Sequence, residues 1–152
     1  MKKQNRINIE GVANNFPRFF EIQTASFCNG GCTICPYKDV EKENKKGIMS
    51  DNLFKKIVDE IAENDNYGIR IIPYFNNEPF LDKKIIERIK YINYKCPGCE
   101  VELSTNLSFL DKKNQNKLSA CNLKDLRLSV FGFSQSSYQK VMAGLDWNNT
   151  KN

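Results

Sequence analysis

Residues 19–37, FFEIQTASFCNGGCTICPY, join an extended segment to three closely spaced cysteines. The first part is rich in β-prone residues that alternate with polar ones, which predicts a strand over 19–26. Cys28, Cys32 and Cys35 follow at once. The three thiols therefore lie directly after the carboxyl end of the first strand.

Two glycines stand between the first and second of these cysteines. We expect Gly30 and Gly31 to let the backbone curl, so that the sulfurs converge on one centre. Three thiolates suit a soft iron site, and three ligands on a four-iron cubane would leave one iron open to another molecule. A zinc site or buried thiols without a role are the alternatives. The chain has no histidine, which removes the common Cys/His zinc patterns.

Strand and helix patterns alternate along the rest of the chain. Apolar residues at helical spacing predict a helix over 51–64 with Ser50 as its N-cap, and β-branched residues predict a strand over 69–75. Asp82 can cap a second helix, which carries an isoleucine stripe and ends at the CPGC turn at 96–99.

The same alternation continues to the end of the chain. The patterns predict strands over 101–105 and 123–130, and helices over 111–120 and 136–143. Four strand–helix units call for right-handed crossovers and a parallel sheet covered by helices, so the expected fold class is α/β. The cysteines and the segments NNEP and STN then share the rim at the strand carboxyl ends, where function usually lies.

Composition narrows the function classes. With 152 residues, 40% of them hydrophobic and 11% aromatic, the chain can form one globular core. The sequence shows no signal-like segment and no apolar run of membrane-spanning length, so we expect a soluble, cytoplasmic protein with no membrane partner and with six reduced cysteines. The net charge of +5 is spread over mixed charges, which argues against nucleic-acid binding as its role.

The C-x3-C-x2-C spacing, at the end of a first strand and before Pro36 and Tyr37, resembles the signature of the radical SAM superfamily. This resemblance implies a partial (β/α)6 barrel, of which the chain would supply about four units. It also implies that Cys28, Cys32 and Cys35 bind a 4Fe-4S cluster and that S-adenosylmethionine is the second cofactor. Tyr37 would flank the adenine with Ile34, or simply cover the loop.

Later strand ends are similar to further motifs of the same family. NNEP at 76–79 resembles its Gly-Gly-Glu-Pro segment, which implies that Asn76, Asn77 and Glu78 receive the ammonium group of S-adenosylmethionine. Asn106, in STN, and Ser129 would contact the same cofactor. From the residues alone, Glu78 could instead be a solvated carboxylate at the rim or the partner of a helix dipole, and Asn106 and Ser129 could satisfy local backbone.

The sequence departs from the family pattern in three places. Ile34 stands where an aromatic residue is usual, asparagines replace glycines at 76 and 77, and Leu107 replaces the glycine of Thr-Asn-Gly. Asparagine tolerates left-handed backbone, so the loop at 76–77 could keep its shape. The chain also ends before the fifth and sixth strands of the usual barrel.

The resemblance implies an enzyme that cleaves S-adenosylmethionine reductively to a 5'-deoxyadenosyl radical, with an external electron donor and a substrate that could be a peptide or protein. The alternative is a non-catalytic iron-sulfur or zinc-binding module. We expect an N-terminal extension over 1–18, the core domain over 19–147 and a tail over 148–152. The remaining thiols, Cys96, Cys99 and Cys121, could form a redox pair or half a zinc knuckle, but their place on the opposite rim favours structural thiols.

Overall fold

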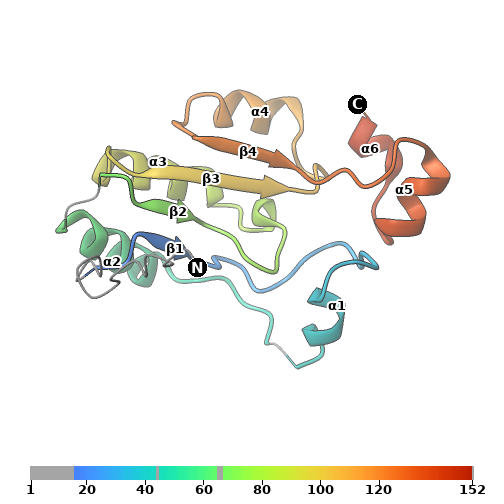
Figure 1. Ribbon diagram of the computed structural model, residues 1–152, viewed down its shortest axis with the longest axis horizontal. Coiled ribbons are helices and arrows are strands. Elements are labelled where there is room, and N and C mark those ends of the chain that lie inside the picture. Colours follow the sequence, from blue (N-terminus) through green and yellow to red (C-terminus); the bar gives the residue numbers. More distant parts are fainter. Residues whose placement is uncertain (1–15, 44, 65–66, 152) are drawn as a thin grey trace, which may run out of the picture.

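Four parallel strands form one sheet, and their order in the sheet is their order along the chain (Figure 1). The computed structural model describes residues 16–43, 45–64 and 67–151. The strands are β1 (Phe19–Glu21), β2 (Arg70–Ile72), β3 (Glu100–Thr105) and β4 (Asp125–Leu128). Each connection between neighbouring strands contains helix, so the predicted α/β fold with four strand–helix units is confirmed.

Three strands are shorter than expected. The last hydrogen bond of β1 with the sheet comes from the Ile22 N–H to the carbonyl of Ile72 at 2.8 Å. Beyond it, Ala25 pairs antiparallel with Ile48, so this part of the predicted strand leaves the sheet for another partner. Pro73 has no N–H to donate, and β2 ends directly before it.

The predicted helices are present with changed ends. They are α2 (Asp51–Ala62), α3 (Ile85–Lys95), α4 (Lys112–Leu118) and α5 (Gln135–Val141). Ser50 caps α2 as predicted, since its side chain accepts a hydrogen bond from the N–H of Leu53 at 3.2 Å. The cap assigned to Asp82 was wrong: Lys84 holds the N-cap position of α3, and Asp82 lies in the preceding turn. There its carboxylate lies 2.7 Å from Nε of the buried Arg88.

Three short elements were not predicted, because one or two turns leave no periodic pattern to detect. They are α1 (Tyr37–Val40), the 3-10 helix η2 (Pro79–Leu81) and α6 (Trp147–Lys151). The Trp147 ring lies 5.2 Å from the Tyr138 ring, so α6 packs on α5. Of the expected extension over 1–18, residues 1–15 lie outside the described part of the chain. No helix among the described residues is long and apolar enough to cross a membrane.

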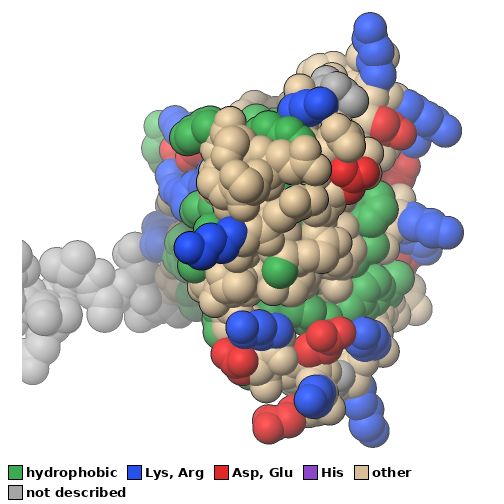
Figure 2. All heavy atoms as spheres, turned by 90° about the vertical axis from the view of Figure 1, so that its right-hand side faces the viewer, with side chains coloured by type: hydrophobic (Ala, Val, Ile, Leu, Met, Phe, Trp, Pro, Cys, Tyr) green, Lys and Arg blue, Asp and Glu red, His purple; other side chains and the backbone are tan. Residues whose placement is uncertain are grey.

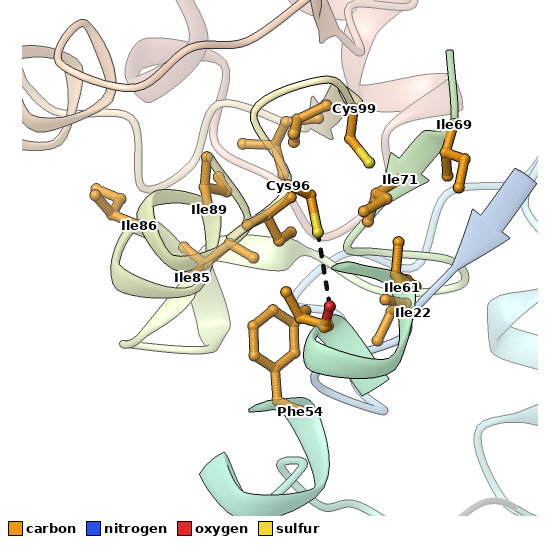
Figure 3. Close-up of a cluster of buried hydrophobic side chains, with 14 of the residues drawn as sticks. Ile22, Phe54, Ile61, Ile69, Ile71, Ile85, Ile86, Ile89, Cys96 and Cys99 are labelled. Carbon is orange, nitrogen blue, oxygen red and sulfur yellow. Dashed lines mark hydrogen bonds between the residues drawn. The ribbon is translucent and has the colours of Figure 1, made fainter. Parts of the chain in front are cut away.

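The main core lies between the sheet and the helices α2 and α3 (Figure 3). Its side chains include Phe54, Ile61, Ile71 and Ile89. Cys96 and Cys99 also belong to it, with Sγ of Cys96 3.6 Å from the carbonyl oxygen of Val58. Burial raises the pKa of both thiols, that of Cys99 to about 12. Both thiols are therefore protonated near neutral pH, and they pack as small hydrophobic side chains do.

Candidate functional site

All four strands point toward the same rim, at the right of Figure 1, where the cysteine loop (residues 27–36) and the helices α5 and α6 lie. A cavity of about 290 Å³ opens there. It is lined by all nine residues predicted for the site, which are Cys28, Cys32, Cys35, Tyr37, Asn76, Asn77, Glu78, Asn106 and Ser129. Figure 2 faces this rim and shows most charged side chains toward its margin.

The cysteine loop is bonded to the ends of the two central strands. The N–H of Glu78, after β2, donates to the carbonyl of Phe27 at 3.3 Å. The side-chain amide of Asn106, after β3, donates to Oδ1 of Asn29 at 2.9 Å and lies 3.9 Å from Sγ of Cys28. The loop therefore meets the segments that follow β2 and β3 in turn, and these contacts place Cys28 beside them.

Backbone N–H groups approach two of the sulfurs. Gly30 N and Tyr37 N each lie 3.5 Å from the Sγ to which they donate, in Cys28 and Cys35 respectively. Burial raises the pKa of Cys28 and of Cys32, and nearby ionised groups raise both further. A metal that needs thiolates must overcome this cost. The Gly30 N–H offsets part of this cost at Cys28, and N–H donors to sulfur are the kind of contact that tunes a cluster's potential.

Neither glycine of the cysteine loop adopts left-handed backbone. Among the described residues, positive φ occurs at other glycines but at neither Gly30 nor Gly31, so no left-handed curl forms here. Gly30 is instead needed for space, because an added Cβ would lie 3.1 Å from Cδ2 of Leu145. The close neighbour comes from the far end of the chain, which spacing within the cysteine motif cannot reveal.

Glu78 is almost fully buried, with 1% of its surface exposed. Oε1 accepts hydrogen bonds from the Phe80 N–H at 3.2 Å and the Thr105 hydroxyl at 2.8 Å, and Oε2 accepts one from the Asn106 N–H at 2.8 Å. A solvated rim carboxylate is therefore excluded. Glu78 is also not the cap of the following helix α3, whose N-cap position is held by Lys84; it caps the short 3-10 helix η2 instead. Burial raises the pKa of Glu78, and these hydrogen bonds oppose the shift.

The left-handed backbone occurs at 107 and not at the two asparagines. Leu107 has φ 68° and is the non-glycine residue with positive φ in the described part of the chain. Leu107 occupies the position of the glycine in the Thr-Asn-Gly motif that residues 105–107 resemble. The backbone there therefore keeps the conformation that glycine favours. Asn77 instead accepts a hydrogen bond from the Phe75 N–H at 2.9 Å.

Two residues that were not predicted as cofactor ligands, Tyr74 and the Ser104 of the STN segment, also line the cavity. The Tyr74 hydroxyl donates to Oε1 of buried Glu102 at 3.0 Å, and Ser104 Oγ lies 3.4 Å from Ser129 Oγ. The alternation of residues along the strand could have indicated Tyr74. Alternate residues share a face, so Tyr74 lies on the same face as Arg70, which pairs with Glu102. Tyr37 is buried where α1 begins.

Among the described residues, the three thiols do not gather around one metal position, so their expected convergence on one centre is not seen. Tetrahedral zinc needs such convergence, whereas a cubane takes each thiolate on a different iron. Cys28, Cys32 and Cys35 are half-buried and line the same cavity, as a cluster that takes one thiolate on each of three irons requires.

Comparison with protein families matches residues 22–152 to the Radical SAM superfamily. The chain belongs to the radical SAM superfamily. No curated protein matches the sequence. Among solved structures, BtrN in complex with AdoMet and 2-DOIA is similar to this radical SAM chain with a TM-score of 0.71 and 22% identity, over 91% of this chain and 56% of BtrN.

Structures of anSMEcpe, from the peptide-modifying branch, are similar as well. The structure with bound AdoMet gives a TM-score of 0.68 and 23% identity, over 88% of this chain and 39% of that one. The structure with AdoMet and the Cp18Cys peptide gives 0.59 and 22%, over 88% and 37%. The radical SAM chain therefore has the fold of these proteins and spans about half of BtrN's length and less of anSMEcpe's.

Proposed function

We propose that this chain binds a 4Fe-4S cluster through Cys28, Cys32 and Cys35 and holds S-adenosylmethionine beside it in the rim cavity. The observation that carries the proposal is that one cavity joins these thiols to the ends of β2, β3 and β4. Membership of the superfamily and the AdoMet-bound neighbours support it.

When bound, such a cluster supplies one electron to S-adenosylmethionine, so that a carbon–sulfur bond breaks to give methionine and a 5'-deoxyadenosyl radical, which takes a hydrogen atom from the substrate. The chain's part is placement, electrostatics and exclusion of solvent. No side chain needs to act as a general base in this step.

The polar groups of the cavity suit the cationic cofactor. The buried carboxylate of Glu78, with the backbone at Asn76 and Asn77, receives the ammonium group. Oε2 of Glu78 accepts one hydrogen bond from the described residues, and its second lone pair can accept another. Asn106 and Ser129 contact the cofactor's polar groups, and Tyr37 and Ile34 flank its adenine.

We further propose an external electron donor and a peptide or protein substrate. A neighbour of the same fold holds a peptide, which supports this substrate class. We propose the cytoplasm as the location of this chain, because a reducing compartment keeps cysteines as thiols. The cavity is compatible with a complete enzyme and with a cluster-binding module that has no turnover. The experiments must therefore distinguish these two hypotheses.

Anaerobic reconstitution with iron and sulfide tests cluster binding. We expect a brown protein, and loss of colour and iron in the triple variant Cys28→Ala, Cys32→Ala, Cys35→Ala. The matched control removes the other three thiols, Cys96→Ala, Cys99→Ala and Cys121→Ala, and should keep both. Iron retained by the first variant, or zinc in place of iron in the native protein, contradicts the proposed cofactor.

Addition of S-adenosylmethionine and a strong reductant tests the reaction. We expect 5'-deoxyadenosine, detected by chromatography with mass spectrometry, in the reconstituted protein and none in the Cys28, Cys32, Cys35 triple variant. A loaded protein that releases no 5'-deoxyadenosine would refute turnover and leave the non-catalytic iron-sulfur module.

A further inference from the structure

The cysteine loop is supported by the connection between α5 and α6, far away in the sequence. Gly31 N donates to the carbonyl of Ala143 at 2.8 Å, and Thr33 N donates to that of Val141 at 2.9 Å. The residue numbers decrease along one segment as they increase along the other. The two segments therefore run antiparallel, as in a short β ladder. Its position fixes the stretch that contains Cys32.

The sulfur of Cys32 also contacts this region. Sγ of Cys32 lies 3.7 Å from Sδ of Met142, whose side chain is only 1% exposed. Cys32 packs against a hydrophobic cluster formed by Tyr138, Met142 and Leu145, separate from the main core. One predicted ligand therefore belongs to the packing of α5 and α6.

Close approach of the two backbones depends on glycines. An added Cβ on Gly30 would lie 3.1 Å from Cδ2 of Leu145. Gly144 has φ 82°, and an added Cβ there would lie 3.6 Å from the N atom of Gly31. An alanine at position 30 would therefore press on the Leu145 side chain, and one at position 144 would strain the backbone.

We propose that residues 141–145, here called the clamp, are a positioning segment for the iron-sulfur cluster, which makes cluster retention and the docking of α5 and α6 mutually dependent. This inference rests on the cluster assigned under the proposed function. A loop held in place before binding loses less conformational freedom when the cluster binds. By linkage, the bound cluster must stabilise the docked clamp by the same free energy.

A double-mutant cycle between Gly30 and Leu145 tests the clamp. Gly30 has no left-handed φ, so alanine fits its backbone and the cost of Gly30→Ala is the collision with Leu145. We expect Gly30→Ala to lose iron to a chelator about 10-fold faster than the native protein, the size typical of an outer-shell change. Adding Leu145→Ala should restore much of the retention, although Leu145→Ala alone leaves a void and lowers it.

Gly47→Ala is the matched control, because nothing lies within 4 Å of its added Cβ. It should retain iron as the native protein does. Thermal unfolding of each metal-free variant shows whether that variant folds. Hydrogen exchange of the native chain is a second measurement that needs no variant. We expect hydrogen exchange in α5 and α6 to slow on cluster loading, with exchange in α4 unchanged.

The outcomes separate the two proposals. A native protein that takes up no iron overturns the proposed function and the clamp with it. A native protein that loads iron, while Gly30→Ala retains it like Gly47→Ala and exchange in α5 and α6 is unaltered, overturns the clamp alone. Slower exchange together with rescue by Leu145→Ala supports it.

Discussion

Glu78 and Thr105 are joined by a hydrogen bond of 2.8 Å between carboxylate and hydroxyl, and both side chains are shielded from solvent. Since Glu78 follows β2 and Thr105 ends β3, this bond fixes two strand ends at the rim. The carboxylate is thus part of the scaffold as well as the group we propose for the ammonium of S-adenosylmethionine.

Glu78→Gln should lower the free energy of unfolding by about 2 kcal/mol. Glutamine has one acceptor oxygen where Glu78 offers two, so at least one buried N–H or hydroxyl loses its partner. Urea unfolding of the metal-free protein measures the loss. Glu60→Gln, on the exposed face of α2, is the control and should change little. Equal midpoints for the two variants would show that the buried hydrogen bonds contribute nothing.

Leu107→Gly should raise the free energy of unfolding by about 1 kcal/mol, because a left-handed φ strains leucine and not glycine. The comparison is Leu110→Gly, which removes a side chain packed on the main core and should lower stability. Thermal unfolding of both variants gives the two signs. A loss of stability for Leu107→Gly would mean that its side-chain contacts outweigh the backbone strain.

Tyr74 should ionise late in an alkaline titration. Burial, followed by the hydrogen bond to Glu102, raises its pKa from 10.0 to about 12. Its contribution to stability is therefore complete below pH 10 and is lost as the pH rises toward 12. Tyrosinate absorbance should show a component near pH 12 that Tyr74→Phe lacks. If that variant removes a component at pH 10 instead, the hydrogen bond to Glu102 is absent in solution.

Cys96 and Cys99 should resist thiol reagents in the folded protein. Both are buried, and burial raises the pKa of each, so little thiolate is available to react. In the variant that lacks Cys28, Cys32 and Cys35, we expect the half-buried Cys121 to react first and the other two after denaturation. Rapid native labelling of all three thiols would revive the redox-pair interpretation of CPGC.

Local patterns predicted the helices and the sheet, because Phe54, Val58 and Ile61 repeat at the spacing of one helix face. Because the motifs follow the carboxyl ends of parallel strands, the sequence also predicted that they lie at one rim of the sheet. The burial of Glu78 could not be predicted, since its partners depend on how the turn after β2 meets the end of β3.

The environment of the cysteines was predictable only in part. Their order after the first strand placed them at the rim, but the support from Met142 and Leu145 involves residues with no pattern linking them to the thiols. The contact of Gly30 with Leu145 could not be predicted for the same reason, because the two residues are far apart in the sequence.

The clamp has a consequence for how the protein is made. Cys32 and Met142 are 110 residues apart. At a synthesis rate of roughly 5 to 20 residues per second, the nascent chain carries its thiols for about 5 to 20 seconds before their support exists. Metal delivered before the clamp has been synthesised would meet a loop that lacks its support, so cluster insertion should follow synthesis of residues 141–145.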